Sequence, residues 1–299
     1  MTRKVRHTMT RVVFALAFAT VASALGFAQS AGASPGMKSG YAPVNSLQLY
    51  YEIHGTGKPL VLLHGGLGSI EMFGPVLSAL AASREVIAVD LQAHGRTADI
   101  DRPLRYELMA DDIAGLLAYL GIGKADVMGY SLGGGVAIQV AIRHPEVVRK
   151  LVVVSCAPQR SGWYPEILAA EAQMTPAVAE QMKQSPLYQL YSSIAPRPQD
   201  WPVLVAKVRD LVTRDYDWSQ DAKKITAPVL LVFADEDAVQ PSSILGFFAL
   251  YGGGAHAPTF DGSGKPTAKL AILPGVTHYD ITMSPLLVSV TTPFLDSEP

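Results

Sequence analysis

The chain has 299 residues, of which 49% are hydrophobic and 17% are charged, and its formal net charge is −2. This composition is typical of a globular protein with one large core, and it excludes disordered and fibrous classes. No run of Lys or Arg follows the first dozen residues, so the basic surface that nucleic-acid binding requires is not expected. A charged polymer is disfavoured as substrate for the same reason.

The first 33 residues have the features of an export signal. Basic residues come first (Arg3 to Arg11), an apolar run covers 12–27, and small residues between Ala28 and Ala33 offer a signal peptidase a place to cut. The apolar run is shorter than the roughly 20 residues that a membrane-spanning helix needs. We therefore expect cleavage rather than stable membrane anchoring, and a periplasmic or secreted protein.

Cys156 is the only cysteine of the chain. An oxidising compartment therefore adds no intramolecular disulfide, and the fold depends on its core alone. A zinc site built from cysteines is also excluded.

A segment rich in Gly, Ser and Pro follows the signal, and we interpret it as a linker up to about Pro43. Beyond it, short apolar segments alternate with amphipathic ones, which predicts a mostly parallel sheet covered by helices on both faces. The first two strands are close enough in sequence to be antiparallel. The expected strands are Leu47–Ile53, Leu60–Leu63, Val86–Val89, Ala125–Met128, Leu151–Ser155, Val229–Phe233 and Leu270–Leu273, and the expected helices include Ile70–Ala82, Tyr106–Leu120 and Leu132–Arg143.

Residues 157–227 break this alternation. They contain no convincing strand, several helix-like pieces such as Pro165–Lys183 and Pro202–Thr213, and all three tryptophans of the chain. We interpret this region as a helical cap inserted into one sheet domain that covers residues 34–299, rather than as a separate domain.

The strongest local signal is residues 129–133, Gly-Tyr-Ser-Leu-Gly, between the expected strand Ala125–Met128 and the expected helix Leu132–Arg143. A serine at such a strand-to-helix turn adopts a strained backbone that exposes its hydroxyl, and the flanking glycines remove Cβ atoms that would clash. The pattern indicates Ser131 as a nucleophile.

A glycine-rich turn, residues 64–68 (His-Gly-Gly-Leu-Gly), follows the expected strand Leu60–Leu63. Acyl transfer passes through a tetrahedral oxyanion that needs two backbone N–H donors. We expect one donor from Leu132, the residue after the nucleophile, and the other from Gly66. A plain tight turn is the alternative for the second site.

Serine needs a base to take its proton and an acid to orient that base. His278 is favoured over His256 as the base, because it follows the last expected strand, where a side chain can reach Ser131. The acid candidates are Asp235, Glu236 and Asp237, which follow Val229–Phe233; we expect one to orient His278 and the others to be solvated or bonded to loop backbone.

Together these motifs resemble the α/β-hydrolase superfamily over about residues 45–296. The resemblance implies an eight-stranded, mostly parallel sheet flanked by helices, with a helical cap. It places the orienting acid at Asp237, although Ala234 stands where the family usually has Gly. It also implies a bracing role for Asp90 and Arg96, in the segment 90–96.

The resemblance implies a serine hydrolase that needs no cofactor and no metal. Family members that use an Asp nucleophile on halides or epoxides are excluded by Ser131. Hydrolysis of a carboxylic ester or lactone is the leading hypothesis; a carbon–carbon hydrolase or a cofactor-free perhydrolase is the alternative, and a non-catalytic binding protein is a third. The oligomeric state stays open.

The aromatic residues of the cap, Trp163 and Tyr164 among them, are expected to line a substrate pocket over Ser131. Their alternative role is to attach the cap to the sheet domain. As a group they favour a small, uncharged, moderately apolar substrate. A glycine-rich insertion after Asp237, from Gly252 to Gly264, is interpreted as a surface loop, with a flap beside the pocket as the alternative.

Overall fold

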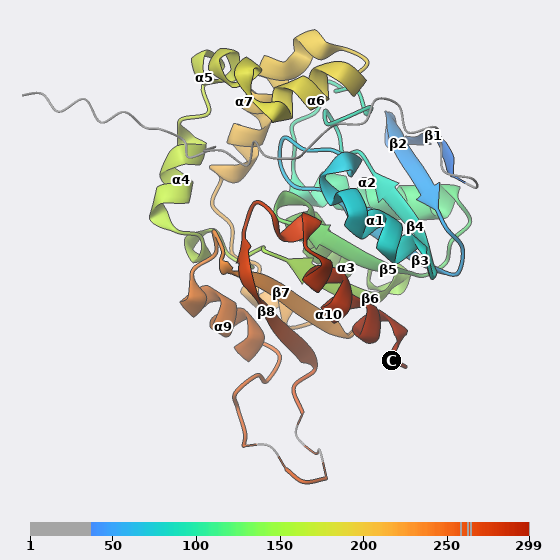
Figure 1. Ribbon diagram of the computed structural model, residues 1–299, viewed down its shortest axis with the longest axis vertical. Coiled ribbons are helices and arrows are strands. Elements are labelled where there is room, and N and C mark those ends of the chain that lie inside the picture. Colours follow the sequence, from blue (N-terminus) through green and yellow to red (C-terminus); the bar gives the residue numbers. More distant parts are fainter. Residues whose placement is uncertain (1–36, 258, 262, 264, 299) are drawn as a thin grey trace, which may run out of the picture. The chain divides into compact units, whose positions relative to one another are not determined.

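The computed structural model describes residues 37–257, 259–261, 263 and 265–298. The expected signal segment lies outside these residues. The described chain forms an eight-stranded sheet in the order β1-β2-β4-β3-β5-β6-β7-β8, which confirms the predicted fold class (Figure 1). Its strands are β1 (Lys38–Val44), β2 (Leu47–His54), β3 (Lys58–Leu63), β4 (Arg84–Val89), β5 (Ala125–Tyr130), β6 (Val148–Val154), β7 (Val229–Glu236) and β8 (Ala268–Thr277).

Strands β3 to β8 are parallel to one another, whereas β2 is antiparallel to both β1 and β4. The linker interpretation up to Pro43 was wrong for residues 38–43, because they belong to β1, which pairs with β2 through the two-residue turn Asn45–Ser46. The first two expected strands, β2 and β3, run in opposite directions as predicted, but β4 lies between them.

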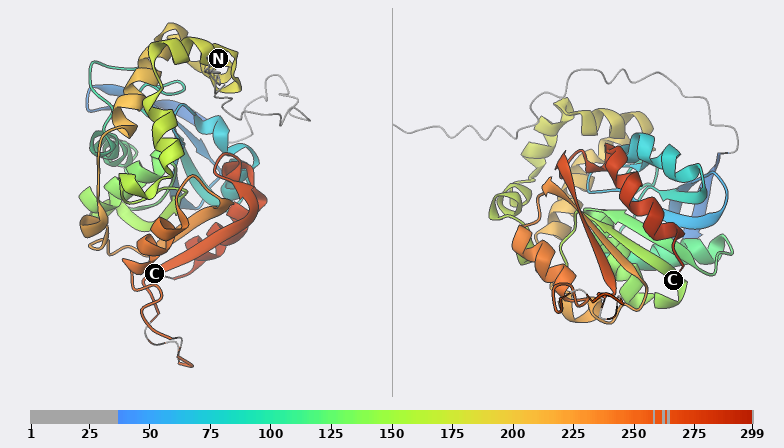
Figure 2. Two further views of the ribbon diagram at one scale, coloured as in Figure 1. Left: turned by 90° about the vertical axis from the view of Figure 1, so that its left-hand side faces the viewer. Right: turned by 60° about the horizontal axis from the view of Figure 1, so that its bottom comes forward.

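The central strands are buried on both faces, as their continuous apolar sequences predict. All six residues of β5 are buried. Alternate residues of β3 enter different cores: Val61 packs with one apolar cluster and Leu62 with the other. Helices α2, α3 and α9 supply the first cluster and α1 and α10 the second, so helices cover both faces of the sheet (Figures 1 and 2). These helices are α1 (Gly74–Ala81), α2 (Tyr106–Tyr119), α3 (Leu132–Arg143), α9 (Pro241–Ala249) and α10 (Pro285–Asp296).

Between β6 and β7 the chain forms five α-helices and no strand within the described residues. The expected helix Pro165–Lys183 is in fact two, because the chain leaves the helix after Ala172 and Thr175 caps a new one by accepting a hydrogen bond from the N–H of Val178. Trp201 is fully buried at the centre of this cap. The cap helices are α4 (Pro165–Ala172), α5 (Pro176–Gln181), α6 (Pro186–Ile194), α7 (Trp201–Val212) and α8 (Ser219–Ala222).

The strand order reverses direction between β3 and β5, which are adjacent although β4 lies between them in sequence. In parallel α/β sheets, ligands bind beyond the carboxyl ends of the strands at such a switch point. The turns that follow β3 and β5 carry the glycine-rich segment 64–68 and Ser131, so the topology brings them together. Over the described part of the chain, no helix combines the length and the apolar character needed to span a membrane.

Candidate active site

Ser131 lies at a sharp turn between β5 and α3. Its backbone angles are φ 52° and ψ −117°, a conformation that non-glycine residues rarely adopt. A Cβ on Gly129 would lie 2.0 Å from the carbonyl oxygen of Gly133, and a Cβ on Gly133 would lie 2.4 Å from the carbonyl oxygen of Leu63. Both glycines are therefore required for the close packing of this turn against its neighbours.

The three side chains expected to act together are in hydrogen-bonding contact. His278 Nε2 lies 3.3 Å from Ser131 Oγ, and His278 Nδ1 lies 3.0 Å from Asp237 Oδ1. The serine is partly exposed, whereas the side chains of His278 and Asp237 are 7% and 1% exposed. This arrangement can remove a proton from Ser131 and stabilise the positive charge that then forms on the imidazole.

Asp237 is held as a carboxylate by several donors. Besides His278, its oxygens accept hydrogen bonds from Ser155 Oγ (2.5 Å), from the N–H of Ala234 (2.9 Å) and from the N–H of Val239 (3.1 Å). Burial raises the pKa of this carboxyl, but the hydrogen bonds and the adjacent His278 outweigh burial and hold the pKa below its ordinary value. Asp237 is consequently ionised at neutral pH and fixes the orientation of the imidazole.

The other two acids of this segment also contact the loop that carries His278, Asp235 through its carboxylate and Glu236 through its backbone carbonyl, while the Glu236 residue is exposed. Asp235 accepts hydrogen bonds from the N–H groups of Gly275 (2.9 Å) and Val276 (3.3 Å). The backbone of His278 is held on both sides, because its N–H donates to the carbonyl of Glu236 (3.0 Å) and its carbonyl accepts from Tyr130 Oη (2.6 Å). The structure thus separates the three acids as expected, with Asp237 alone on the imidazole.

The two expected oxyanion donors are neighbours. A Cβ on Gly66 would lie 3.5 Å from Leu132 Cδ1, and Leu132 is the first residue of α3, where an N–H has no partner within the helix. The buried His64 orients the Gly65–Gly66 peptide. The Nε2 atom of His64 accepts a hydrogen bond from the N–H of Leu91 (3.1 Å). The ring hydrogen is therefore on Nδ1, which donates to the Gly65 carbonyl (2.7 Å). Burial lowers the pKa of His64 to about 4, which keeps the ring neutral.

Asp90 and Arg96 brace the turn beside this peptide. The Asp90 carboxylate accepts hydrogen bonds from the N–H of Ile70 (2.9 Å) and the N–H of Arg96 (2.8 Å). The Arg96 guanidinium contacts Asp90 at 3.3 Å and Glu71 at 2.5 Å. These bonds connect the segment after β4 with the segment after β3 and contact no reacting group, which agrees with a structural role.

Trp163 and Tyr164 lie beside the imidazole. The Trp163 ring is 5.7 Å from the His278 ring, edge to face, and its Nε1 donates to Tyr216 Oη at 2.8 Å. Tyr164 is 38% exposed and lines a cavity of about 320 Å³. The same cavity is lined by the triad residues Asp237 and His278, and by Glu166, Ile167, Glu236, Ala238, Thr277 and Tyr279.

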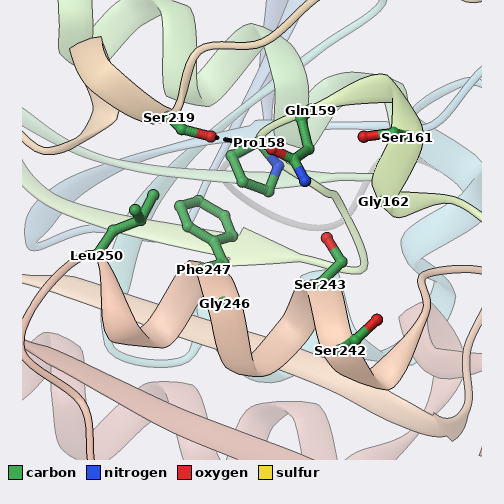
Figure 3. Close-up of a pocket in the computed structure, with 10 residues that line it drawn as sticks. All are labelled: Pro158, Gln159, Ser161, Gly162, Ser219, Ser242, Ser243, Gly246, Phe247 and Leu250. Atoms are coloured by element: carbon green, nitrogen blue, oxygen red, sulfur yellow. Dashed lines mark hydrogen bonds between the residues drawn. The ribbon is translucent and has the colours of Figure 1, made fainter. Parts of the chain in front are cut away.

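A second cavity, of about 350 Å³, lies between the start of the cap and α9 (Figure 3). Four serines and Gln159 give it a polar, uncharged lining, and Phe247 closes one side. None of the expected site residues lines it. It is therefore separate from the triad.

The other histidines of the described residues, and the insertion, lie away from this site or have other partners. His256 is exposed in the insertion, whose described residues lead into the amino end of β8, the end opposite to His278. Figure 1 shows this loop extending away from the cap. The surface-loop interpretation thus fits the structure better than the flap. His144 contacts Asp111 at 2.7 Å, and His94 is buried beside His64.

Two residues that support the triad, Ser155 and Tyr130, were not predicted from the sequence. Ser155 directly follows β6, the neighbour of β7, and parallel neighbouring strands deliver their ends to the same edge. Its position at the carboxyl end of the expected strand Leu151–Ser155 was thus a usable signal for contact with Asp237. Tyr130 lies inside the nucleophile motif itself, and its partner is a backbone carbonyl distant in sequence, which no motif could indicate.

Residues 60–289 match the model of the alpha/beta hydrolase family. RutD of Azorhizobium caulinodans, a protein named as a carbamate hydrolase, is 30% identical over 217 residues, which cover 68% of this chain and 82% of that protein. The pimeloyl-[acyl-carrier protein] methyl ester esterase of Neisseria meningitidis is 32% identical over 207 residues, covering 62% and 77% of the two chains.

Among solved structures, the carboxylesterase CesB (YbfK) of Bacillus subtilis aligns with a TM-score of 0.67. Its sequence is 21% identical to this chain, and the alignment covers 88% of this chain and 93% of that one. At this level of identity the similarity establishes a shared fold.

Proposed function

The chain belongs to the α/β-hydrolase family, and on that premise we propose that this hydrolase cleaves a carboxylic ester or lactone through an acyl-enzyme on Ser131. The observation that carries the proposal is the hydrogen-bonded series from Ser131 through His278 to Asp237, at a strained turn that exposes the serine hydroxyl. A relative named as a methyl ester esterase supports the same reaction class.

In the proposed reaction, Ser131 Oγ attacks the carbonyl carbon while its proton passes to His278 Nε2. The N–H groups of Leu132 and Gly66 stabilise the negative charge on the carbonyl oxygen, assisted by the N-terminus of α3. His278 then gives the proton to the leaving alkoxide, and the acyl group remains on Ser131. Water, deprotonated by His278, hydrolyses the acyl-enzyme and restores the serine.

The proposed substrate is small and moderately apolar. The cavity of about 320 Å³ beside His278 lies at the lower end of the range of about 300–1,000 Å³ found for small-molecule sites. Tyr164 lines this cavity and would contact the acyl or alcohol part of the ester, whereas the buried ring of Trp163 packs against His278 and is not part of the lining.

We also propose that the protein is exported to the periplasm or beyond the cell. The proposal rests on the order of basic, apolar and small residues in the first 33 positions. N-terminal sequencing of the protein recovered from the periplasmic and medium fractions of a Gram-negative host tests it. A mature N-terminus between residues 29 and 34 is expected. Full-length protein confined to the cytoplasm would contradict it.

The test of the ester-hydrolase proposal is the variant Ser131→Ala, assayed with short p-nitrophenyl esters. We expect kcat to fall at least about a thousandfold while the circular dichroism spectrum is unchanged. Ser289→Ala is a matched control, because this exposed hydroxyl bonds only the carbonyl of Pro285 on α10. Retention of a substantial fraction of the parental rate by Ser131→Ala would show that another group performs the reaction.

A further inference from the structure

Glu171 lies on the face of α4 that points toward the triad. Residues separated by three or four positions share one face of a helix, so within α4 Glu171 shares its face with Ile167 and Leu168. Tyr164 and Ile167 line the cavity beside His278, and Leu168 packs against the buried core. Glu171 therefore lies on the inner face of the cap, one turn along α4 from the residues that line the cavity.

Three tyrosines from different elements interact electrostatically with the carboxyl group of Glu171. Tyr106 is the first residue of α2, Tyr216 lies between α7 and α8 in the cap, and Tyr279 directly follows His278. Burial is the main cause of the raised pKa of each hydroxyl, and the negative charge of Glu171 raises all three further. These hydroxyls belong both to the sheet domain and to the cap, and one of them is next to His278 in sequence, which agrees with the place of Glu171 on the inner face of α4.

Arg160 offsets the charge of this carboxyl only in part. No hydrogen bond or ion pair to it occurs among the described residues, and Arg160, the cation that favours its charge, donates its Nε–H to the carbonyl of Val212. Burial raises the pKa of Glu171 to about 7, with Arg160 opposing that effect only in part. The adjacent cavity adds Glu166 and Glu236 and has no Lys or Arg in its lining.

A half-buried carboxylate that forms no ion pair with any described residue, next to aromatic rings, attracts cations and repels anions. We propose that Glu171 sets the charge selectivity of the site, so that esters with a cationic group are turned over in preference to neutral esters of the same shape, and anionic esters are the poorest substrates. The inference rests on the proposed ester hydrolysis and names a substrate class for it: small esters that carry an ammonium group, in place of the uncharged substrate that the aromatic residues of the cap predicted.

The test compares substrates of equal shape and different charge. Butyrylthiocholine and its uncharged isostere 3,3-dimethylbutyl thiobutyrate place the difference in the leaving group. The p-nitrophenyl esters of 4-(trimethylammonio)butyrate and of 5,5-dimethylhexanoate place it in the acyl group. For at least one pair we expect the parental enzyme to favour the cationic ester in kcat/KM by about tenfold at low ionic strength, with the preference falling as salt is added.

The variant Glu171→Gln keeps the size of the side chain and removes its charge. We expect it to bring the cationic-to-neutral ratio close to one, mainly through KM for the cationic ester. Glu180→Gln is the matched control, because Glu180 lies on α5 in the same cap, is 59% exposed and pairs with Lys183. We expect this control to keep the parental cationic-to-neutral ratio. That result would show that removing a carboxylate elsewhere in the cap does not change the ratio.

The outcomes separate this inference from the proposed function. Equal rates for the cationic and neutral members of both pairs, or a preference that Glu171→Gln leaves unchanged, would overturn the role of Glu171 while ester hydrolysis stands. If the parental enzyme hydrolyses none of the four esters, the proposed function fails and the inference fails with it.

Discussion

The nucleophile turn and the cap helix α4 both border the site, but the chain constrains them in different ways. In the turn, a Cβ on Gly129 or Gly133 would lie within 2.4 Å of a carbonyl oxygen, and Ser131 adopts a strained backbone conformation. In α4, none of the residues is fully buried, and Glu171, one of its two acids, forms no hydrogen bond or ion pair with a described residue through its carboxyl group. Reaction chemistry is therefore fixed by backbone packing, whereas substrate choice depends on side chains that can change without disturbing the fold.

The largest effect on activity is expected at the residue that orients the base. Asp237→Asn keeps the size of the side chain but presents an amide to His278 Nδ1, which favours the wrong tautomer and removes the negative charge. We expect kcat to fall by about 10³- to 10⁴-fold, measured with a p-nitrophenyl ester. Asp221→Asn, on α8 and paired with Lys224, is the matched control and should keep the parental rate. A loss of less than tenfold in Asp237→Asn would contradict the assigned role.

The next largest effect is expected on stability, at the turn. Gly133→Ala places a Cβ 2.4 Å from the carbonyl oxygens of Leu63 and His64, so the backbone of β3 or α3 has to move. We expect the free energy of unfolding to fall by about 3 kcal/mol, measured by urea denaturation. At Gly123 a Cβ meets nothing within 4 Å, so Gly123→Ala should change stability by no more than about 0.5 kcal/mol. Equal stability of the two variants would show that the turn is not sterically constrained.

The smallest effect is a pH dependence of substrate preference. Burial raises the pKa of Glu171 to about 7, so the carboxyl is mostly neutral below that pH and charged above it. The groups that face it are Arg160, Tyr106, Tyr216 and Tyr279. The cationic-to-neutral ratio of kcat/KM should therefore rise by roughly fivefold from about pH 6 to about pH 8.

The matched control for this pH dependence is the same ratio in Glu171→Gln, which should be flat across the range. A ratio that rises equally in the variant would assign the dependence to another group.

The parts of the fold that could be predicted from the sequence are those with local signals. The apolar strands β3 and β5 and the bounds of α3 follow from periodicity and flanking glycines. The edge strand β1 was missed because Ala42 and Val44 are its only buried residues, so its sequence has no apolar strand pattern. Its strand conformation depends on pairing with β2, which is a tertiary contact. The strand β8 was predicted too short, since it includes Pro274, which an edge strand tolerates.

The candidate site shows the same division. Ser131, Leu132 and Gly66 follow from turns whose geometry requires particular residue types, and His278 follows from its place after a strand. Asp237 could be chosen among three adjacent acids only through the family resemblance, because the choice depends on which carboxylate turns inward. Glu171 has no motif at all; its role depends on the burial and on the absence of a partner among the described residues, and both are tertiary properties.

The most direct measurement of the central claim is covalent labelling with a fluorophosphonate, followed by peptide mapping of the intact parental enzyme. A serine deprotonated by an adjacent imidazole attacks phosphorus and displaces fluoride, which leaves a stable adduct on its oxygen. We predict one adduct per chain, on Ser131, and none in the variant His278→Ala. An unlabelled parental protein, or an adduct at another serine, would contradict the account.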